Sequence, residues 1–111
     1  MNIKNLIEND NFKVINIAEK AEGIEIKNIY CCDLLSMAMS KMPEKAAWVT
    51  VMSNVNSLAV ASLTHATCVV LAGGVAADEA MKIKAEEHGI TVISTALPIF
   101  EATLLIRELM N

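Results

Sequence analysis

The chain has 111 residues and a mild net charge of −4, with its lysines scattered rather than clustered. It therefore lacks the basic surface that binding to DNA or RNA requires. Apolar residues make up 54% of the chain but aromatic residues only 4%, which predicts an aliphatic core. A chain of this length forms one domain and buries roughly two-thirds of its unfolded surface without a metal or disulfide.

The N-terminus and the cysteines indicate a cytoplasmic protein that does not enter a membrane. Residues 1–10 include charged side chains and no signal-peptide core, and no apolar run is long enough to span a bilayer. Cys31 and Cys32 are neighbours on a predicted strand, so their side chains point to opposite faces and do not form a chelating pair. Together with Cys68 they predict reduced thiols, and we expect no metal and no cofactor.

Residues 1–30 predict a less regular N-terminal part. In chain order we expect a short amphipathic helix capped by Asn2, a strand over residues 12–17, a polar turn over 19–23 and a strand over 24–30. Both strands alternate apolar and polar residues, as edge strands with one exposed face do. At least one of them can pair antiparallel with the rest of the sheet.

Residues 31–111 alternate regularly between strand and helix patterns. We expect a helix from Asp33 to Met42, a strand over 47–52, a helix over 57–64, a strand over 67–71, a helix over 76–88, a strand over 90–93, and a last helix from Pro98 to near Met110. Short connections in such a pattern predict right-handed crossovers. The predicted fold is a single α/β domain over residues 1–111, with a mostly parallel sheet in two or three layers.

The loops that follow the predicted strands form the candidate site, because open parallel sheets bind ligands beyond the carboxyl ends of their strands. The polar and glycine residues of these loops are Asp33, Ser53, Asn54, Asn56, Gly73, Gly74, Ser94 and Thr95. Each loop leads toward a helix whose first N–H groups point outward with partial positive charge. A small anion or a polar ring would find hydrogen-bond donors there.

Simpler structural roles compete with binding at several of these positions. Asp33, with Ser36 in the first turn, also predicts a helix cap. Residues 53–56 are typical of caps and turns, although two asparagines around Val55 exceed what one helix start needs. Gly73-Gly74 lacks the remainder of either phosphate-binding motif, so it predicts positive φ and close packing. Acidic residues at the start of the next helix, Asp78 and Glu79, argue against a phosphate at that helix start.

Nothing in the sequence calls for catalysis. His65 and His88 fall at the C-terminal ends of predicted helices, away from the candidate loops, so no base lies beside Cys32, Ser53 or Ser94. A paired-carboxylate mechanism needs a second acid besides Asp33. We expect no enzyme, with an enzyme that uses Asp33, Ser53 or Cys32 as the open alternative.

The stretch from Asp33 to Glu108 resembles the DRTGG domain family. The matching segments are Cys32–Ser36, Trp48–Val51 with Asn54–Asn56, Cys68–Leu71 with Gly73-Gly74, and Ala85–Thr95. The resemblance implies a sensing or dimerising module that accompanies regulated enzymes, including pyrophosphatases with CBS domains. It also implies a fold similar to the N-terminal domain of HPr kinase/phosphorylase. Ser53–Asn56 stands where the resemblance implies an Asp-Arg-Thr run, which removes a cation, and the 111 residues contain no kinase domain or phosphate-binding loop.

Two functional hypotheses result from these observations. One is a non-catalytic regulatory module that binds a small metabolite or a nucleotide at the carboxyl edge of the sheet. The alternative is a homodimeric interaction module without a small ligand, suggested by the surplus of aliphatic and Met side chains for a chain of this size.

Overall fold

A five-stranded sheet forms the centre of the computed structural model, which describes residues 1–19 and 21–110. The strands are β1 (Lys13–Asn16), β2 (Asn28–Cys31), β3 (Ala46–Thr50), β4 (Cys68–Leu71) and β5 (Val92–Ser94). Their order across the sheet is β1-β5-β4-β3-β2, with β2 to β5 parallel and β1 antiparallel to β5. The prediction of a mostly parallel sheet is confirmed, as is that of one antiparallel N-terminal strand.

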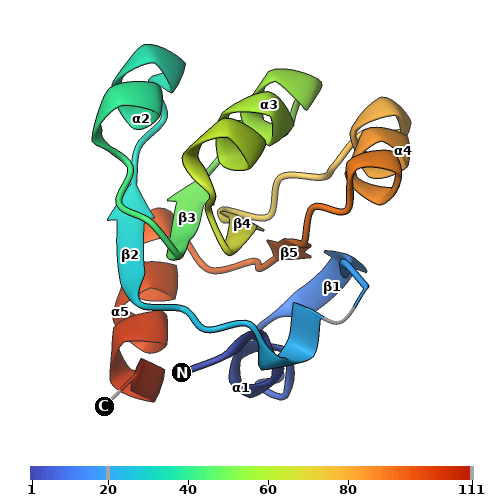
Figure 1. Ribbon diagram of the computed structural model, residues 1–111. Helices are drawn as coiled ribbons and strands as arrows, with labels where there is room; N and C mark the ends of the chain where they lie inside the picture. The colour runs from blue at the N-terminus through green and yellow to red at the C-terminus, as the bar shows by residue number, and fades with distance from the viewer. Residues whose placement is uncertain (20, 111) are drawn as a thin grey trace.

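Helices cover both faces of the sheet, so the domain has three layers (Figure 1). One face carries α2 (Leu35–Lys41), α3 (Val55–Thr64) and α4 (Glu79–His88), and the other carries α1 (Ile3–Ile7) and α5 (Ile99–Met110). The connections from β2 to β5 therefore all cross on one face, and after β5 the chain returns to the face that carries α1. None of the helices in the described part of the chain has the length and apolar character that a bilayer crossing requires.

The core consists of two apolar clusters, one on each side of the sheet. Val49, Val70 and Ile93 contribute to the cluster under α1 and α5. Trp48 and Val69 contribute to the cluster under the other three helices. All of β3 and β4 is buried, which explains why β4 has an uninterrupted apolar sequence, as central strands covered on both faces do.

The helix termini follow the polar residues that the sequence offers. Asn2 begins α1 with a reciprocal capping box, as predicted. Asp78 accepts a hydrogen bond from the Met81 backbone N–H at 2.7 Å and so begins α4 later than the predicted start at residue 76. Gly89 ends α4 in the left-handed conformation, at φ 64°.

The predicted strand over residues 24–30 is wrong in its first half, because residues 24–26 pair with the N-terminal segment instead of the sheet. The Ile3 N–H donates to the Ile24 carbonyl at 3.2 Å, and the Ile26 N–H donates to the Met1 carbonyl at 2.7 Å. This local pairing buries Ile26 and produces the alternation that resembled a longer strand. Of the predicted turn over 19–23, Lys20 lies outside the described residues, and Ala21–Gly23 forms a 3₁₀ helix.

Candidate functional site at the carboxyl edge of the sheet

Asp33 joins two loops and does not cap α2 as predicted. Its Oδ1 accepts hydrogen bonds from the Thr50 hydroxyl at 2.6 Å and from the Val51 N–H at 3.0 Å. The capping position of α2 is occupied by Leu34, without a side-chain cap. The capping prediction is wrong because the buried hydroxyl of Thr50, on the neighbouring strand, binds the carboxylate instead. Asp33 thus fixes the start of the β2–α2 connection to the end of β3.

In and just after the polar loop that follows β3, side chains form hydrogen bonds with nearby backbone groups. The Asn54 side-chain oxygen accepts from the Asn56 N–H at 2.9 Å and from the Ser57 N–H at 3.3 Å, so Asn54 caps α3. The Ser57 hydroxyl donates to the Met52 carbonyl at 2.7 Å. Asn56 lies in the first turn of α3 and is exposed, whereas Ser53 is half-buried in the loop. Helix capping therefore accounts for Asn54 and leaves Asn56 without a structural role.

The connections after β4 and β5 begin together and then part. Gly73 and Gly74 adopt the predicted positive φ, at 71° and 72°. The Gly73 N–H donates to the Leu97 carbonyl at 2.7 Å, and the Gly74 N–H donates to the Thr95 carbonyl at 3.0 Å. Beyond these bonds one chain segment leads to α4 and the other to α5, on opposite faces of the sheet (Figure 1). Adjacent connections that leave on opposite faces open the crevice in which α/β sheets bind ligands.

A hollow of about 270 Å³ lies beside this point of divergence, and we call it the β5 hollow. Its lining residues are Lys13, Ile15, Gly74, Val75, Ala76, Ala77, Lys82, Ser94, Thr95 and Ala96. Three predicted site residues meet here, namely Gly74, Ser94 and Thr95, although Ser94 is the last residue of β5 rather than a loop residue. The other five predicted residues, Asp33, Ser53, Asn54, Asn56 and Gly73, do not line the hollow.

Lys13 and Lys82 are the charged residues of the β5 hollow, and sequence reasoning missed both of them. Lys13 lies opposite Ser94 in the antiparallel pair of β1 and β5, and Lys82 projects from α4. Lys13 lines the hollow together with Ile15, which packs under α4 at a register irregularity of β1 between Val14 and Asn16. In the sequence, the alternation of apolar and polar residues over 12–17 was the signal that could have pointed to Lys13. Nothing in the sequence relates Lys13 to Lys82, because the antiparallel pairing of β1 brings the two together.

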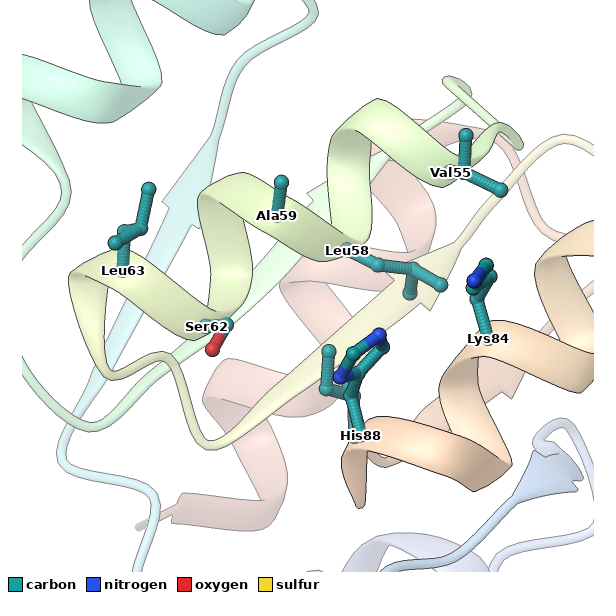
Figure 2. A pocket seen from close by; sticks show the side chains of 8 residues that line it. Val55, Leu58, Ala59, Ser62, Leu63, Lys84 and His88 are labelled. Atoms are coloured by element: carbon teal, nitrogen blue, oxygen red, sulfur yellow. The ribbon is translucent and has the colours of Figure 1, made fainter.

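An apolar groove of about 250 Å³ runs between α3 and α4 on the helical face (Figure 2). Its lining residues are Val55, Leu58, Ala59, Ser62, Leu63, Lys84, His88 and Ile90. Figure 2 shows the Lys84 and His88 side chains extending from α4 along this groove. Lys84 also forms an ion pair with Glu87 at 3.3 Å. The lining is mainly aliphatic and does not include any of the predicted site residues.

Both histidines lie at the opposite edge of the sheet from the candidate site, as predicted. His65 ends α3 in the left-handed conformation shortly before β4 begins, and His88 is the last residue of α4. Neither imidazole therefore lies beside Ser53 or Ser94.

The three cysteines lie in separate environments. The Cys31 Sγ lies 3.0 Å from the Thr103 hydroxyl of α5, whereas Cys32 packs in the cluster on the other face, so the prediction of opposite faces is confirmed. Cys68 is buried in β4, and this burial raises the pKa of its thiol to about 12. Among the side chains that the structure describes, no three of His, Cys, Asp or Glu converge on a metal position.

Comparison with known proteins relates the chain to one solved regulatory region. No protein-family model and no curated protein sequence matches the chain. Its structure is similar to the CBS and DRTGG domains of the regulatory region of Clostridium perfringens pyrophosphatase, solved in complex with the activator diadenosine tetraphosphate, at a TM-score of 0.80. The chain has a CBS/DRTGG-like fold. The match has 17% sequence identity and covers 97% of this chain but 46% of the pyrophosphatase chain, so this chain spans about half of that length.

Proposed function

We propose that the chain is a non-catalytic regulatory module of the DRTGG type, which binds a small metabolite or a nucleotide in the β5 hollow. The supporting observation is the position of the hollow, beside the two adjacent connections that leave the sheet on opposite faces. Open α/β sheets bind ligands at such a divergence because the parting connections leave room between them.

The fold likeness supports a regulatory role. The pyrophosphatase region to which the chain is similar is itself regulatory, and its activator is a nucleotide. The resemblance of Asp33 to Glu108 to the DRTGG family agrees with that comparison. A nucleotide or related metabolite is therefore the first class of ligand to test, although Ser53–Asn56 lacks the cation of the family's motif.

The predicted site residues divide into two proposed roles. Gly74, Ser94 and Thr95 contact the ligand, because they line the hollow. Asp33, Asn54 and Gly73 position the edge, because their hydrogen bonds hold the connections to one another and to the helix start. Ser53 and Asn56 contact a ligand that extends from the hollow across β4 toward α3.

Thermal unfolding with a ligand panel tests this proposal. The panel contains nucleosides, nucleotides, sugar phosphates and amino acids, and a ligand at 100 times its Kd stabilises the protein by about 2.7 kcal/mol. Ser94→Ala is expected to reduce the stabilisation, whereas Ser62→Ala, in the groove between α3 and α4, leaves it unchanged. A panel without any stabilising compound, with no bound molecule in native mass spectrometry of gently purified protein, would contradict the proposal.

A second candidate function is self-association through α5 and the open edge of β2. Phe100 is 70% exposed and Leu104 is 46% exposed, and both line a shallow hollow beside Asn28 and Ile29. If two α5 helices pair antiparallel about Leu104, each Glu101 lies opposite Arg107 of the partner subunit, because the two positions are equally distant from Leu104 in sequence. The charges of this surface are thus complementary to those of a second copy.

Sedimentation at micromolar concentration tests the second candidate. We expect a dimer that dissociates in Leu104→Asp and persists in Leu63→Asp, a matched change at an exposed leucine on α3. A monomer at this concentration would contradict self-association and leave the ligand proposal standing.

A further inference from the structure

We infer that the β5 hollow takes a phosphate-type oxyanion, so that the ligand is a phosphorylated small molecule whose charged end lies between Lys13 and Lys82. The inference rests on the proposed function and names the chemical class of its ligand.

The two lysines reach the hollow from different elements. Lys13 lies on β1 and Lys82 on α4, and both line the same space as the end of β5. Two ammonium groups around one hollow repel each other, and a bound anion between them removes that repulsion. Because the chain as a whole carries a net charge of −4, this positive charge is a local feature.

Among the side chains that the structure describes, which leave out those of Lys20 and Glu22, neither lysine has an acidic partner within 4.0 Å. The ion pairs of this part of the chain use Lys4, Lys27 and Lys84. Asp78, one turn before Lys82, directs its carboxylate to the Met81 N–H at 2.7 Å. The charge of both ammonium groups therefore remains available to a ligand.

The remaining lining suits an oxyanion. Ser94 faces the same side of the sheet as Lys13 and is half-buried, and within the described part of the chain its hydroxyl has no hydrogen-bond partner. The space beside Gly74 is open, since a Cβ placed there meets no atom within 4 Å, and a ligand can approach its backbone closely. The anion lies over the end of β5 and not at the start of α4, where Asp78 and Glu79 argue against a phosphate.

The size of the hollow indicates which part of a ligand it holds. Its volume of about 270 Å³ is slightly below the roughly 300–1,000 Å³ of pockets that enclose a whole drug-sized molecule. A phosphate with an adjacent sugar or short chain therefore fits inside, while the remainder of a nucleotide extends outward along the divergence of the two connections.

A nuclear magnetic resonance titration with inorganic phosphate at constant ionic strength tests the inference on this 12.0 kDa chain. We expect saturable shifts in the amide signals of Gly74, Ala76 and Ser94. Lys13→Met and Lys82→Met, which keep most of the side-chain volume, are each expected to weaken phosphate binding about tenfold, the loss of one charge-assisted contact. Lys84→Met, on the same helix but facing the other groove, keeps the original affinity.

Adenosine and adenosine 5′-monophosphate separate this inference from the proposed function. Tighter binding of the monophosphate, with an advantage that disappears in Lys13→Met and Lys82→Met, supports the inference. If both compounds shift the signals of Gly74 and Ser94 and bind equally to the wild type and to every lysine variant, the inference is overturned while the proposed function stands. The inference is also overturned if chloride causes the same amide chemical-shift changes as phosphate. The same holds if the changes caused by phosphate persist in all three lysine variants.

Discussion

At the β2–β3 half of the carboxyl edge, polar side chains bind their own fold, whereas at the β4–β5 half two lysines and Ser94 line an open hollow. Thr95 belongs to both descriptions, because it lines the hollow while its hydroxyl accepts a hydrogen bond from the Leu97 N–H at 3.2 Å. Asp33 accepts hydrogen bonds from the end of β3, and Asn54 caps α3. Lys13, Lys82 and Ser94 instead surround the β5 hollow. Both halves have the same sequence pattern, a strand followed by a polar loop and a helix, so the pattern alone does not locate the binding site.

The direction of the connections explains the difference between the halves. The loops after β2 and β3 both lead to helices on one face, so they run side by side and their polar groups meet one another. The loops after β4 and β5 lead to opposite faces, and space remains where they part (Figure 1). Substitutions of Asp33 and Asn54 in the β2–β3 half should therefore reduce stability, whereas substitutions of the residues that line the hollow at the β4–β5 half should reduce binding.

The largest expected effect is that of Asp33→Ala in the β2–β3 half. The change removes a charged acceptor from the Thr50 hydroxyl, which is 0% exposed, and from the Val51 N–H. We expect a loss of about 2 kcal/mol in the free energy of unfolding by urea denaturation. Asp10→Ala, at an exposed acid, is the control. A loss below about 0.5 kcal/mol, the size of an ordinary surface change, would show that Asp33 does not hold the edge together.

Cys68, the first residue of β4, makes stability depend on alkaline pH. Burial raises the pKa of its thiol from 9.0 to about 12, so the folded state retains a proton that the unfolded state loses. Its contribution is complete below pH 9 and is lost progressively between pH 9 and pH 12. Unfolding measured at pH 8 and pH 10 should differ by about 1.4 kcal/mol more in the wild type than in Cys68→Ala. An identical difference in both proteins would refute this linkage.

Asn54 and Asn56, at the start of α3, form a matched pair. Asn54→Ala removes the cap of α3 and is expected to cost about 1 kcal/mol in thermal or urea unfolding. Asn56→Ala alters an exposed side chain of the first turn and is expected to stay within about 0.5 kcal/mol of the wild type. Equal losses of stability in the two variants would mean that the capping hydrogen bonds of Asn54 do not account for its contribution to stability.

Ser94→Ala should have the smallest effect on stability, within about 0.5 kcal/mol, because it removes a half-buried hydroxyl that borders open space. The same variant should bind phosphate more weakly in the titration described above. A large loss of stability with unchanged phosphate binding would show that Ser94 supports the fold instead of binding the ligand, and so contradict the comparison between the two halves.

The sequence predicts the sheet better than the site. The uninterrupted apolar run of β4 and the Asn2 cap depend on local pattern, and both are confirmed. Asp33 was misread because a capping preference is local, whereas its partner Thr50 is on another strand. Lys13 and Lys82 were missed because their proximity depends on the antiparallel docking of β1 against β5, and no spacing in the chain expresses that contact.

A crystal structure of protein purified without removing bound molecules, with the most stabilising compound of the panel added, tests the central claim most directly. We expect a ligand in the β5 hollow, beside Gly74 and Ser94, with its charged group between Lys13 and Lys82. A ligand bound solely in the groove between α3 and α4, or solely beside Asn56, would contradict it.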